Sequence, residues 1–496
     1  MALATMPYDL AVISAGWLSS NGTGTQVHYG IARYAQDGSS LGRVEWPPAD
    51  TARPGQNYVV GVRTLNRIQL SDTGQAIVTG HVPGNTGDRD FMTIAYSGDL
   101  SALIWSARFD FTDDPERYTG DDVPVDLWAL RLSDPSPALI PYVAVTGYSQ
   151  SSNAGTDIQT VVYNSTGAPL TDATPLRYTS SGAHPDWPCG VYLRRVSDSP
   201  DYHMMLIVGG TTWTSNGNAY VVLVYDIDTQ APAAATLVST LTYGVSDYAC
   251  DAMAMKVIDD PVESLLSVVV TGTKTYLPSE PPGQPDYLTV KWSYNASTQA
   301  WSQSWVETYD NGDDDTAVAV DGDVIKNTTG GFTEIIAVTG RSYSSSTGYD
   351  ATTIVYADAH VFSPPSVTHA KQWTGRLDGI ANGDDRGVAV KVYPSDDGTI
   401  NGSGVYVTAS ATNGVPNLDY MAALYDGLAD SGNKAFKTNG RLFFPLVTSG
   451  TPGDDVPIAM TLIRVGSDWR AFVTGRTATT TQGDNFLTQG YHYVVP

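Results

Sequence analysis

The sequence is poor in basic residues. Only eight of its 496 residues are lysine, the first of them Lys256, and the formal net charge at pH 7 is −25. Phosphate binding requires clustered lysine and arginine, so this deficit excludes nucleic acid as a general partner. A surface of hydroxyls, amides and carboxylates keeps a protein soluble and resists nonspecific association.

Other patterns are missing as well. No stretch of 18 apolar residues occurs, so we expect no transmembrane segment. No segment keeps a 3.6-residue periodicity, so we expect almost no helix. The sequence has no His-x-x-x-His zinc spacing, no Gly-x-Ser-x-Gly elbow and no glycine loop for phosphates. A non-catalytic protein is therefore favoured, and whether the chain is an enzyme stays open.

The amino end, Met1–Tyr8, lacks the basic region and the apolar core of a secretory signal. We expect an extracellular protein at a cell or virion surface, which reaches its place after removal of a signal or without one.

What the sequence has in abundance is one repeated phrase. It is clearest at residues 335–356, where a β-branched run ends in Thr-Gly, a Ser-rich turn follows, and a second run ends in an aromatic residue. The first half of the phrase ends at Gly16, Gly80, Gly147, Gly210, Gly272, Gly340, Ala409 and Gly475. The second half ends at Tyr34, Tyr96, Tyr163, Tyr225, Trp292, Tyr356, Tyr425 and Tyr491. A period of about 62–70 residues indicates an array of one supersecondary unit.

Each unit is expected to hold four strands. The phrase supplies two, a strand with an aromatic residue such as Trp105 or Trp305 follows, and a strand of small residues such as 315–320 completes the unit. This pattern predicts an all-β fold, a single β-propeller of four-stranded antiparallel blades that spans residues 1–496 as one domain. The chain is expected to begin and end inside a unit. Eight blades are favoured, one of them incomplete, and seven remain an alternative.

The repeat resembles a known family. Val-Thr-Gly-x-Ser, then Asp-Tyr/Ala-x-Thr-Val-x-Tyr, Trp-x-x-x-Tyr and Gly-Asp-Asp-x-Ala-x-Ala-Val are similar to the bacterial β-propeller repeat of secreted and surface proteins. The resemblance covers nearly the whole chain and departs from the pattern at Ala409-Ser410 and Gly209-Gly210. It implies a propeller, usually of seven blades, but no single activity and no catalytic residues.

Polar residues open the small-residue strands. Alignment of the repeats places Asn57, Asp122, Cys189, Cys250, Asp315, Asp385 and Asp455 at one position, and acidic neighbours precede four of them: Asp121, Asp314, Asp384 and Asp454. If these strands line the propeller axis, the carboxylates converge at one mouth of the channel. Asp122, Asp315, Asp385 and Asp455 are then candidate ligands for Ca²⁺. The alternative is that each aspartate caps a turn.

The two cysteines, Cys189 and Cys250, lie one repeat apart and are predicted to occupy equivalent places. They are candidates for a disulfide between adjacent blades, which would indicate an oxidising compartment. The alternative is that both are free thiols that fill space in the core.

Aromatic residues follow several Thr-Gly strands, in loops that are expected to share one face of the propeller. They are Trp17, Tyr148, Trp213, Tyr276 and Tyr343. Aromatic rings among hydroxyls and amides suit sugars, which need a face to stack on and polar groups at the rim. The long Pro-rich loop 277–286 is a further candidate contact. Alternatively these rings shield the edges of neighbouring sheets.

The sequence therefore predicts a non-catalytic binding or adhesion scaffold whose partner is a glycan or a surface protein. A first alternative is a polysaccharide hydrolase or lyase with Asp315 and Asp385 as a carboxylate pair at ~5–9 Å. A second is a structural subunit that self-assembles into a filament or virion.

Overall fold

The computed structural model contains strands and no helix in the ranges that it describes. These ranges are 2–5, 11–19, 26–37, 39–46, 55–56, 58–65, 74–84, 88–110, 120–131, 141–151, 155–170, 176–180, 184–196, 203–229, 234–261, 263–276, 284–327, 331–362, 365–378, 383–393, 403–412, 418–426, 441–444, 452–465, 468–479 and 483–493. In this part of the chain no helix is long and apolar enough to cross a membrane.

The fold is an all-β propeller of four-stranded antiparallel blades, as predicted. The chain divides into two compact units, one of Met1–Tyr243, Thr461–Thr474 and Phe486–Pro496, the other of Gly244–Met460 and Gly475–Asn485. Each unit is described by itself, and the organisation of residues 1–496 as one domain stays a prediction.

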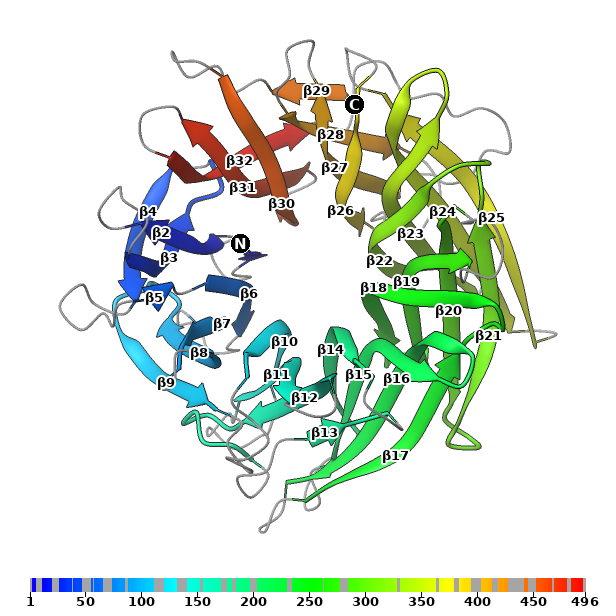
Figure 1. Ribbon diagram of the computed structural model, residues 1–496, viewed down its shortest axis with the longest axis horizontal. Coiled ribbons are helices and arrows are strands. Elements are labelled where there is room, and N and C mark those ends of the chain that lie inside the picture. The colour runs from blue at the N-terminus through cyan, green and yellow to red at the C-terminus, as the bar shows by residue number, and fades with distance from the viewer. Residues whose placement is uncertain are drawn as a thin grey trace. The chain divides into compact units, whose positions relative to one another are not determined.

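The first unit holds four blades, in each of which consecutive strands pair (Figure 1). Their strands are β1 (Ala2–Thr5), β2 (Val12–Ser19), β3 (Gln26–Tyr34), β4 (Ser40–Trp46) and the short β5 (Gly55–Gln56); β6 (Tyr58–Leu65), β7 (Gln75–Pro83), β8 (Arg89–Ser97) and β9 (Leu103–Phe109); β10 (Asp122–Arg131), β11 (Pro141–Ser151), β12 (Gly155–Tyr163) and β13 (Leu176–Tyr178); and β14 (Trp187–Arg195), β15 (His203–Thr214), β16 (Gly217–Asp228) and β17 (Ala234–Tyr243).

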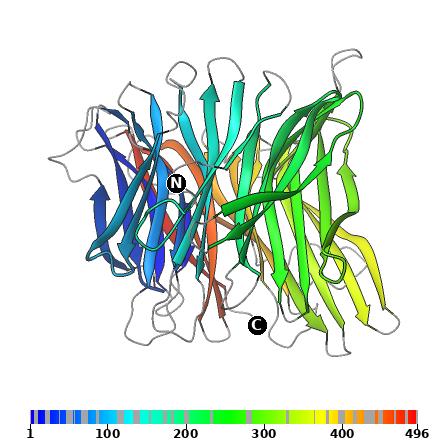
Figure 2. The ribbon, with the colours of Figure 1, turned by 90° about the horizontal axis from the view of Figure 1, so that it is seen from below.

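The second unit holds three blades, whose long antiparallel hairpins are also visible in Figure 2. Their strands are β18 (Tyr248–Asp260), β19 (Leu265–Tyr276), β20 (Asp286–Asn295) and β21 (Ala300–Tyr309); β22 (Asp315–Asn327), β23 (Gly331–Ser344), β24 (Gly348–Phe362) and β25 (Pro365–Leu377); and β26 (Arg386–Tyr393), β27 (Gly404–Thr412), β28 (Leu418–Asp426) and β29 (Arg441–Phe444).

The last repeat forms a three-stranded sheet of β30 (Pro452–Val465), β31 (Asp468–Thr479) and β32 (Gly483–Tyr493). The described residues therefore give seven complete blades and this eighth, three-stranded sheet. The prediction that the chain begins inside a unit is wrong, because β1 pairs with β2 and completes the first blade. Residues 2–5 lack the acidic turn that marks the other first strands, so alignment of the repeats missed them.

Hydrophobic clusters lie between successive blades. The second and third strands of a blade are buried on both faces, as in β7 and β8, whereas the fourth strand β9 alternates between exposed and covered residues. Three fourth-strand tryptophans pack on a tyrosine in the third strand of the next blade. These pairs are Trp105 with Tyr163, Trp305 with Tyr356 and Trp373 with Tyr425. These aromatic pairs pack between successive blades.

The Thr-Gly phrase has a packing explanation. Gly340 of β23 lies opposite Ala317, where β22 carries a β-bulge, and a Cβ on Gly340 would overlap the carbonyl oxygen of Thr316. The preceding Thr339 shares a 3.0 Å hydrogen bond with Thr353 of β24. Equivalent threonine pairs join the second and third strands in other blades: Thr79 with Thr93, Thr146 with Thr160, and Thr271 with Thr289. The phrase therefore encodes a close approach of three strands.

Candidate functional site

Three of the four aspartates predicted to bind metal lie in clusters of carboxylates. In each cluster one ligand atom from each of three aspartates lies within 4.8 Å of the other two. The clusters are Asp90, Asp110 and Asp122; Asp286, Asp310 and Asp315; and Asp350, Asp378 and Asp385. We call them the first, second and third carboxylate cluster.

The three clusters are built in the same way at three blade junctions. One aspartate begins or precedes the first strand of a blade, as Asp315 begins β22. The other two come from the preceding blade: Asp286 opens its third strand β20, and Asp310 follows its fourth strand β21. A backbone hydrogen bond of 2.6 Å from Asp315 to Pro285 joins the two blades beside the second cluster. Each cluster therefore bridges two successive blades.

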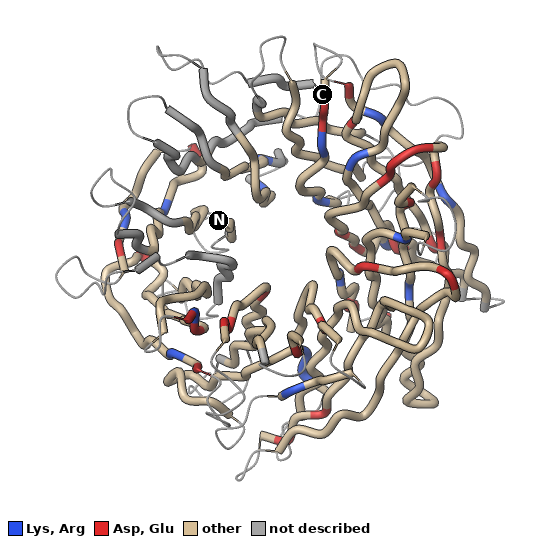
Figure 3. Tube along the Cα trace, in the orientation of Figure 1, with Lys and Arg blue, Asp and Glu red and all other residues tan. Residues whose placement is uncertain are grey.

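Burial and crowding raise the pKa of several of these carboxyls. Burial raises the pKa of Asp90 to about 6, although Arg108 lowers it. Burial also raises the pKa of Asp315 to about 6, with smaller contributions from Asp286 and Asp310. Basic residues are few along the described chain (Figure 3), and each cluster has one basic partner: Arg108 on Asp90, Lys274 on Asp286, and Arg376 on Asp350.

The candidate aspartates do not share one cluster, and their convergence at one channel mouth stays a prediction. Asp315 and Asp385 belong to different clusters, and both side chains are fully buried. The carboxylate pair of the hydrolase or lyase alternative stays a prediction. The side chain of Asp455 and the whole of Asn57 lie outside the described residues.

The acidic neighbours have other partners, so they do not complete the clusters. Asp121 forms an ion pair with Arg89, and Asp314 accepts a 2.9 Å hydrogen bond from the Tyr349 hydroxyl. Sequence reasoning missed the actual partners, although they left a signal. The aspartate that opens the second half of the phrase recurs, and Arg-x-Asp recurs at 108–110 and 376–378.

The predicted equivalence of the two cysteines is wrong. In the blades of Cys250 and Asp315, the glycine of the Thr-Gly phrase pairs with a residue on the first strand. Cys250 lies two residues before that partner in its blade, and Asp315 lies two residues before it in its own blade. In β14 that position belongs to Asp186, and Cys189 is the extra residue of the β-bulge between Pro188 and Gly190. Both cysteines are free thiols in the structure, and burial raises the pKa of each thiol. The disulfide between the two cysteines stays a prediction, but the equivalent repeat positions on which it was based are not found.

All five predicted contact aromatics lie in strands and not in loops. Tyr148, Trp213, Tyr276 and Tyr343 all pair across their blades near the ends of second strands. Trp17 lies in β2, and its side chain is outside the described residues, as is most of the Pro-rich loop, 277–283. The strand positions make these aromatics part of the sheet surface, with one ring face covered by a neighbour.

Four aromatic rings gather where the third blade meets the fourth. Tyr148 contacts Trp187 edge to face with ring centroids 4.5 Å apart, and His184 stacks on Trp213 at 4.3 Å. Trp187 lies opposite Thr211 on β15, so its side chain is on the same face of the sheet as Trp213. Trp187 is 41% exposed, which is unusual for so large a ring. We call these four residues the aromatic surface.

A second aromatic contact occurs in the other unit. Tyr276 is 42% exposed and packs against Tyr248 with ring centroids 4.1 Å apart. The ammonium group of Lys274 lies 4.8 Å above the Tyr248 ring. This pair therefore combines an exposed ring with a nearby positive charge.

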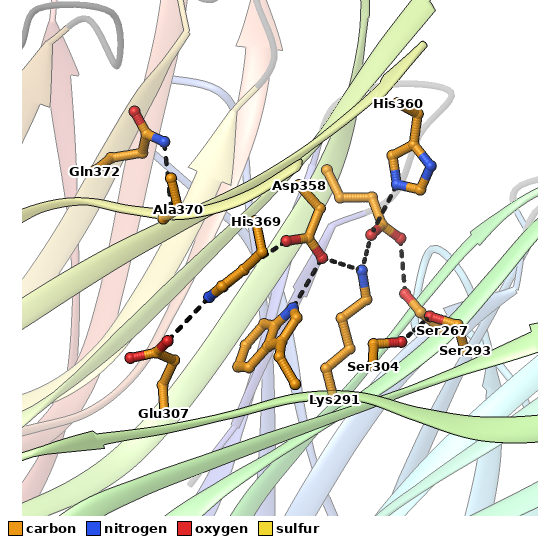
Figure 4. Close-up of polar contacts among 12 residues, drawn as sticks. Ser267, Lys291, Ser293, Ser304, Glu307, Asp358, His360, His369, Ala370 and Gln372 are labelled. Atoms are coloured by element: carbon orange, nitrogen blue, oxygen red, sulfur yellow. Dashed lines mark hydrogen bonds and ion pairs between the residues drawn. The ribbon is translucent and has the colours of Figure 1, made fainter. Parts of the chain in front are cut away.

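A buried network of charges lies between the fifth and sixth blades, at Lys291 (Figure 4). The Lys291 side chain is buried and forms ion pairs with Glu334 of β23 and Asp358 of β24. Asp358 also accepts hydrogen bonds from Trp305 Nε1 at 2.9 Å and from His369 Nδ1 at 2.6 Å. The ion pairs of this network hold one blade to the next. No sequence motif predicted this network, because its residues come from five strands.

The same network sets the charge of its histidines. Burial lowers the pKa of His369, but bonding to Asp358 and Glu307 outweighs this, so the pKa of His369 is raised. Burial and the charge of Lys291 lower the pKa of His360 to about 4, which leaves His360 neutral at pH 7. Burial raises the pKa of Asp358, but His369, Lys291 and Trp305 outweigh it and lower the pKa to about 2.

These shifts predict how stability depends on pH. A raised histidine pKa contributes stability fully below the unfolded value of about 6.5 and loses it as pH rises through the folded pKa. We therefore expect the stability gap between wild type and His369→Gln, measured by urea unfolding, to be larger at pH 6 than at pH 9. His360→Gln is the matched control with the opposite sign, since a histidine whose folded pKa is lowered to about 4 destabilises the fold at pH 6 relative to pH 9. If the stability difference between wild type and His369→Gln were equal at both pH values, the raised pKa of His369 would be contradicted.

Comparisons with known proteins identify no family. No protein-family model and no curated protein matches the chain, so the resemblance to the bacterial β-propeller repeat stays a prediction. Among solved structures, the polysaccharide lyase Uly1 is 8% identical over 96% of this chain and 87% of its own, with a TM-score of 0.37. The GH43 endo-arabinanase from Bacillus licheniformis is 10% identical over 60% and 92%, with a TM-score of 0.26. The tail fiber of a Staphylococcus aureus phage is 8% identical over 89% and 93%, with a TM-score of 0.21. Likenesses this weak support no inference about what this chain does.

Proposed function

We propose that the protein is a non-catalytic scaffold that binds a glycan on its aromatic surface. The observation that carries the proposal is Trp187, whose ring is exposed and is held from the side by Tyr148. A ring held in this way loses little conformational freedom on binding, which lowers the cost of association. Sugar rings present C–H faces that pack on such a ring.

Polar groups border the aromatic surface. The Arg89–Asp121 ion pair lies close enough to Tyr148 for both charges to influence the pKa of its hydroxyl, which burial raises. These side chains are partly exposed and offer donors and acceptors for sugar hydroxyls. The net charge of −25 disfavours anionic partners. We therefore infer that the ligand is a neutral oligosaccharide.

Trp187→Ala tests this site. We expect the variant to bind the oligosaccharide at least about tenfold more weakly than wild type in a calorimetric titration, because a central aromatic anchor contributes ~1.4 kcal/mol or more. Trp301→Ala is the matched control, since Trp301 is a half-buried partner of Tyr294 on the β20–β21 hairpin. If both variants lost binding affinity equally, or if Trp187→Ala lost none, the ligand would bind elsewhere on the protein.

A further inference from the structure

We propose that each of the three carboxylate clusters binds a Ca²⁺ ion that links one blade to the next. Ca²⁺ binds oxygen ligands at about 2.3–2.6 Å, so ligands on opposite sides of one ion stand about 5 Å apart. The three ligand atoms of each cluster lie within 4.8 Å of one another. One ion can therefore contact all three aspartates without movement of the backbone.

A buried oxygen in each cluster accepts no hydrogen bond. These atoms are Oδ1 of Asp90, Oδ1 of Asp315 and Oδ1 of Asp350. The three residues are 0%, 0% and 3% exposed. Burial of an unsatisfied carboxylate oxygen is costly, because the group has lost its water and gained nothing in return. A cation in the cluster supplies the missing partner in all three cases.

The charges of the clusters fit a divalent ion. Each cluster holds three carboxylates, and one of the three is paired with a basic residue. One aspartate of each cluster is less buried than the other two, as Asp310 is in the second cluster. That side leaves room for water molecules to complete the coordination shell of Ca²⁺. Mg²⁺ fits less well, since it requires near-octahedral ligands at 2.0–2.1 Å and retains its water.

The junction between the third and fourth blades provides an internal comparison. Asp157 and Asp186 take two of the cluster positions, but Thr179 stands where the others have aspartate. Arg177 pairs with Asp157, and both oxygens of Asp186 accept hydrogen bonds, from Thr212 Oγ1 and from the backbone nitrogen of Ser180. This junction has one carboxylate fewer. Oδ1 of Asp157 is also buried without a hydrogen-bond partner, so the third carboxylate is what distinguishes the other junctions.

The test is direct titration of the full chain with CaCl₂ after removal of metal by chelating resin. Calorimetry is expected to give at least three Ca²⁺ ions per chain, and 1 mM Ca²⁺ is expected to raise the Tm by roughly 3–5 °C because it binds only the folded state. No binding and no change in Tm would overturn the proposal. An equal response to Mg²⁺ would overturn the assignment to Ca²⁺.

Variants locate the ions. Asp310→Asn removes one carboxylate from the second cluster, yet its amide oxygen can still accept the 2.6 Å hydrogen bond from the Gly312 backbone nitrogen. This variant is expected to bind one ion fewer than wild type. Asp313→Asn, in the same turn but outside the cluster, is the matched control and is expected to bind the full number. Binding of the full number of ions by Asp310→Asn would overturn the assignment of an ion to the second cluster. The titration of wild type remains a valid test even if a variant fails to fold.

Discussion

Replacement of Lys291 by methionine is expected to lower the free energy of unfolding by about 3–5 kcal/mol, the usual cost of removing one partner from a buried ion pair. Lys291 is 1% exposed, and its ammonium group is the basic partner of two buried carboxylates, Glu334 and Asp358. Methionine keeps the unbranched apolar part of the side chain but removes the ammonium group, which leaves Glu334 without its lysine and Asp358 with His369 as its remaining ionic partner. Urea unfolding at pH 7 measures the change as a lower midpoint at an unchanged m value.

Lys326→Met is the control for this prediction. Lys326 also pairs with two carboxylates, Asp260 and Glu263, but its side chain is 52% exposed. Exposed pairs contribute about 0–1 kcal/mol, so this variant is expected to unfold close to wild type. If the two lysine variants lost the same stability, the buried network would not hold the fifth and sixth blades together as described.

Gly340→Ala is expected to cost about 3 kcal/mol, near the upper end for overpacking of a core. The new methyl group would overlap the carbonyl oxygen of Thr316, a backbone atom that cannot rotate away. Relief requires the bulge of β22 to move, and Ala317 at that bulge is fully buried. Thermal and urea unfolding of the variant measure the cost.

The neighbouring blade provides the matched control. There the chain carries Ala409 at the same position, opposite Gly387 on β26, so the glycine has moved to the partner strand. Ala409→Gly removes one methyl group and adds backbone freedom, and it is expected to cost no more than about 1 kcal/mol. A Gly340→Ala variant as stable as Ala409→Gly would show that the Thr-Gly phrase is not retained for close packing.

The sequence was sufficient to predict the strands, their pairing and their role in packing, because a period-two pattern and a fixed repeat determine these locally. Residues 335–356 form the hairpin of β23 and β24, as the phrase predicts. The first strand, β1, was missed because Ala2–Thr5 carries too little pattern to align. Cys189 was misaligned because a β-bulge inserts one residue beside it, which a count of residues cannot detect.

The sites were predicted only in part, because they depend on contacts between blades. The sequence indicates Asp315 as a candidate ligand, but its partners Asp286 and Asp310 lie in another blade, and the predicted fellow ligands are the aspartates at the equivalent repeat position. Trp187 was overlooked because it opens a first strand and does not follow a Thr-Gly strand. Only the register of β14 on β15 shows that it shares a face with Trp213.

Glycan binding by the aromatic surface is the central claim, and an array of immobilised glycans probed with the intact chain at high micromolar concentration tests it most directly. We predict retention on a group of neutral oligosaccharides, lost in Trp187→Ala and kept in Trp301→Ala. Retention on no glycan by a folded wild-type chain would contradict the claim.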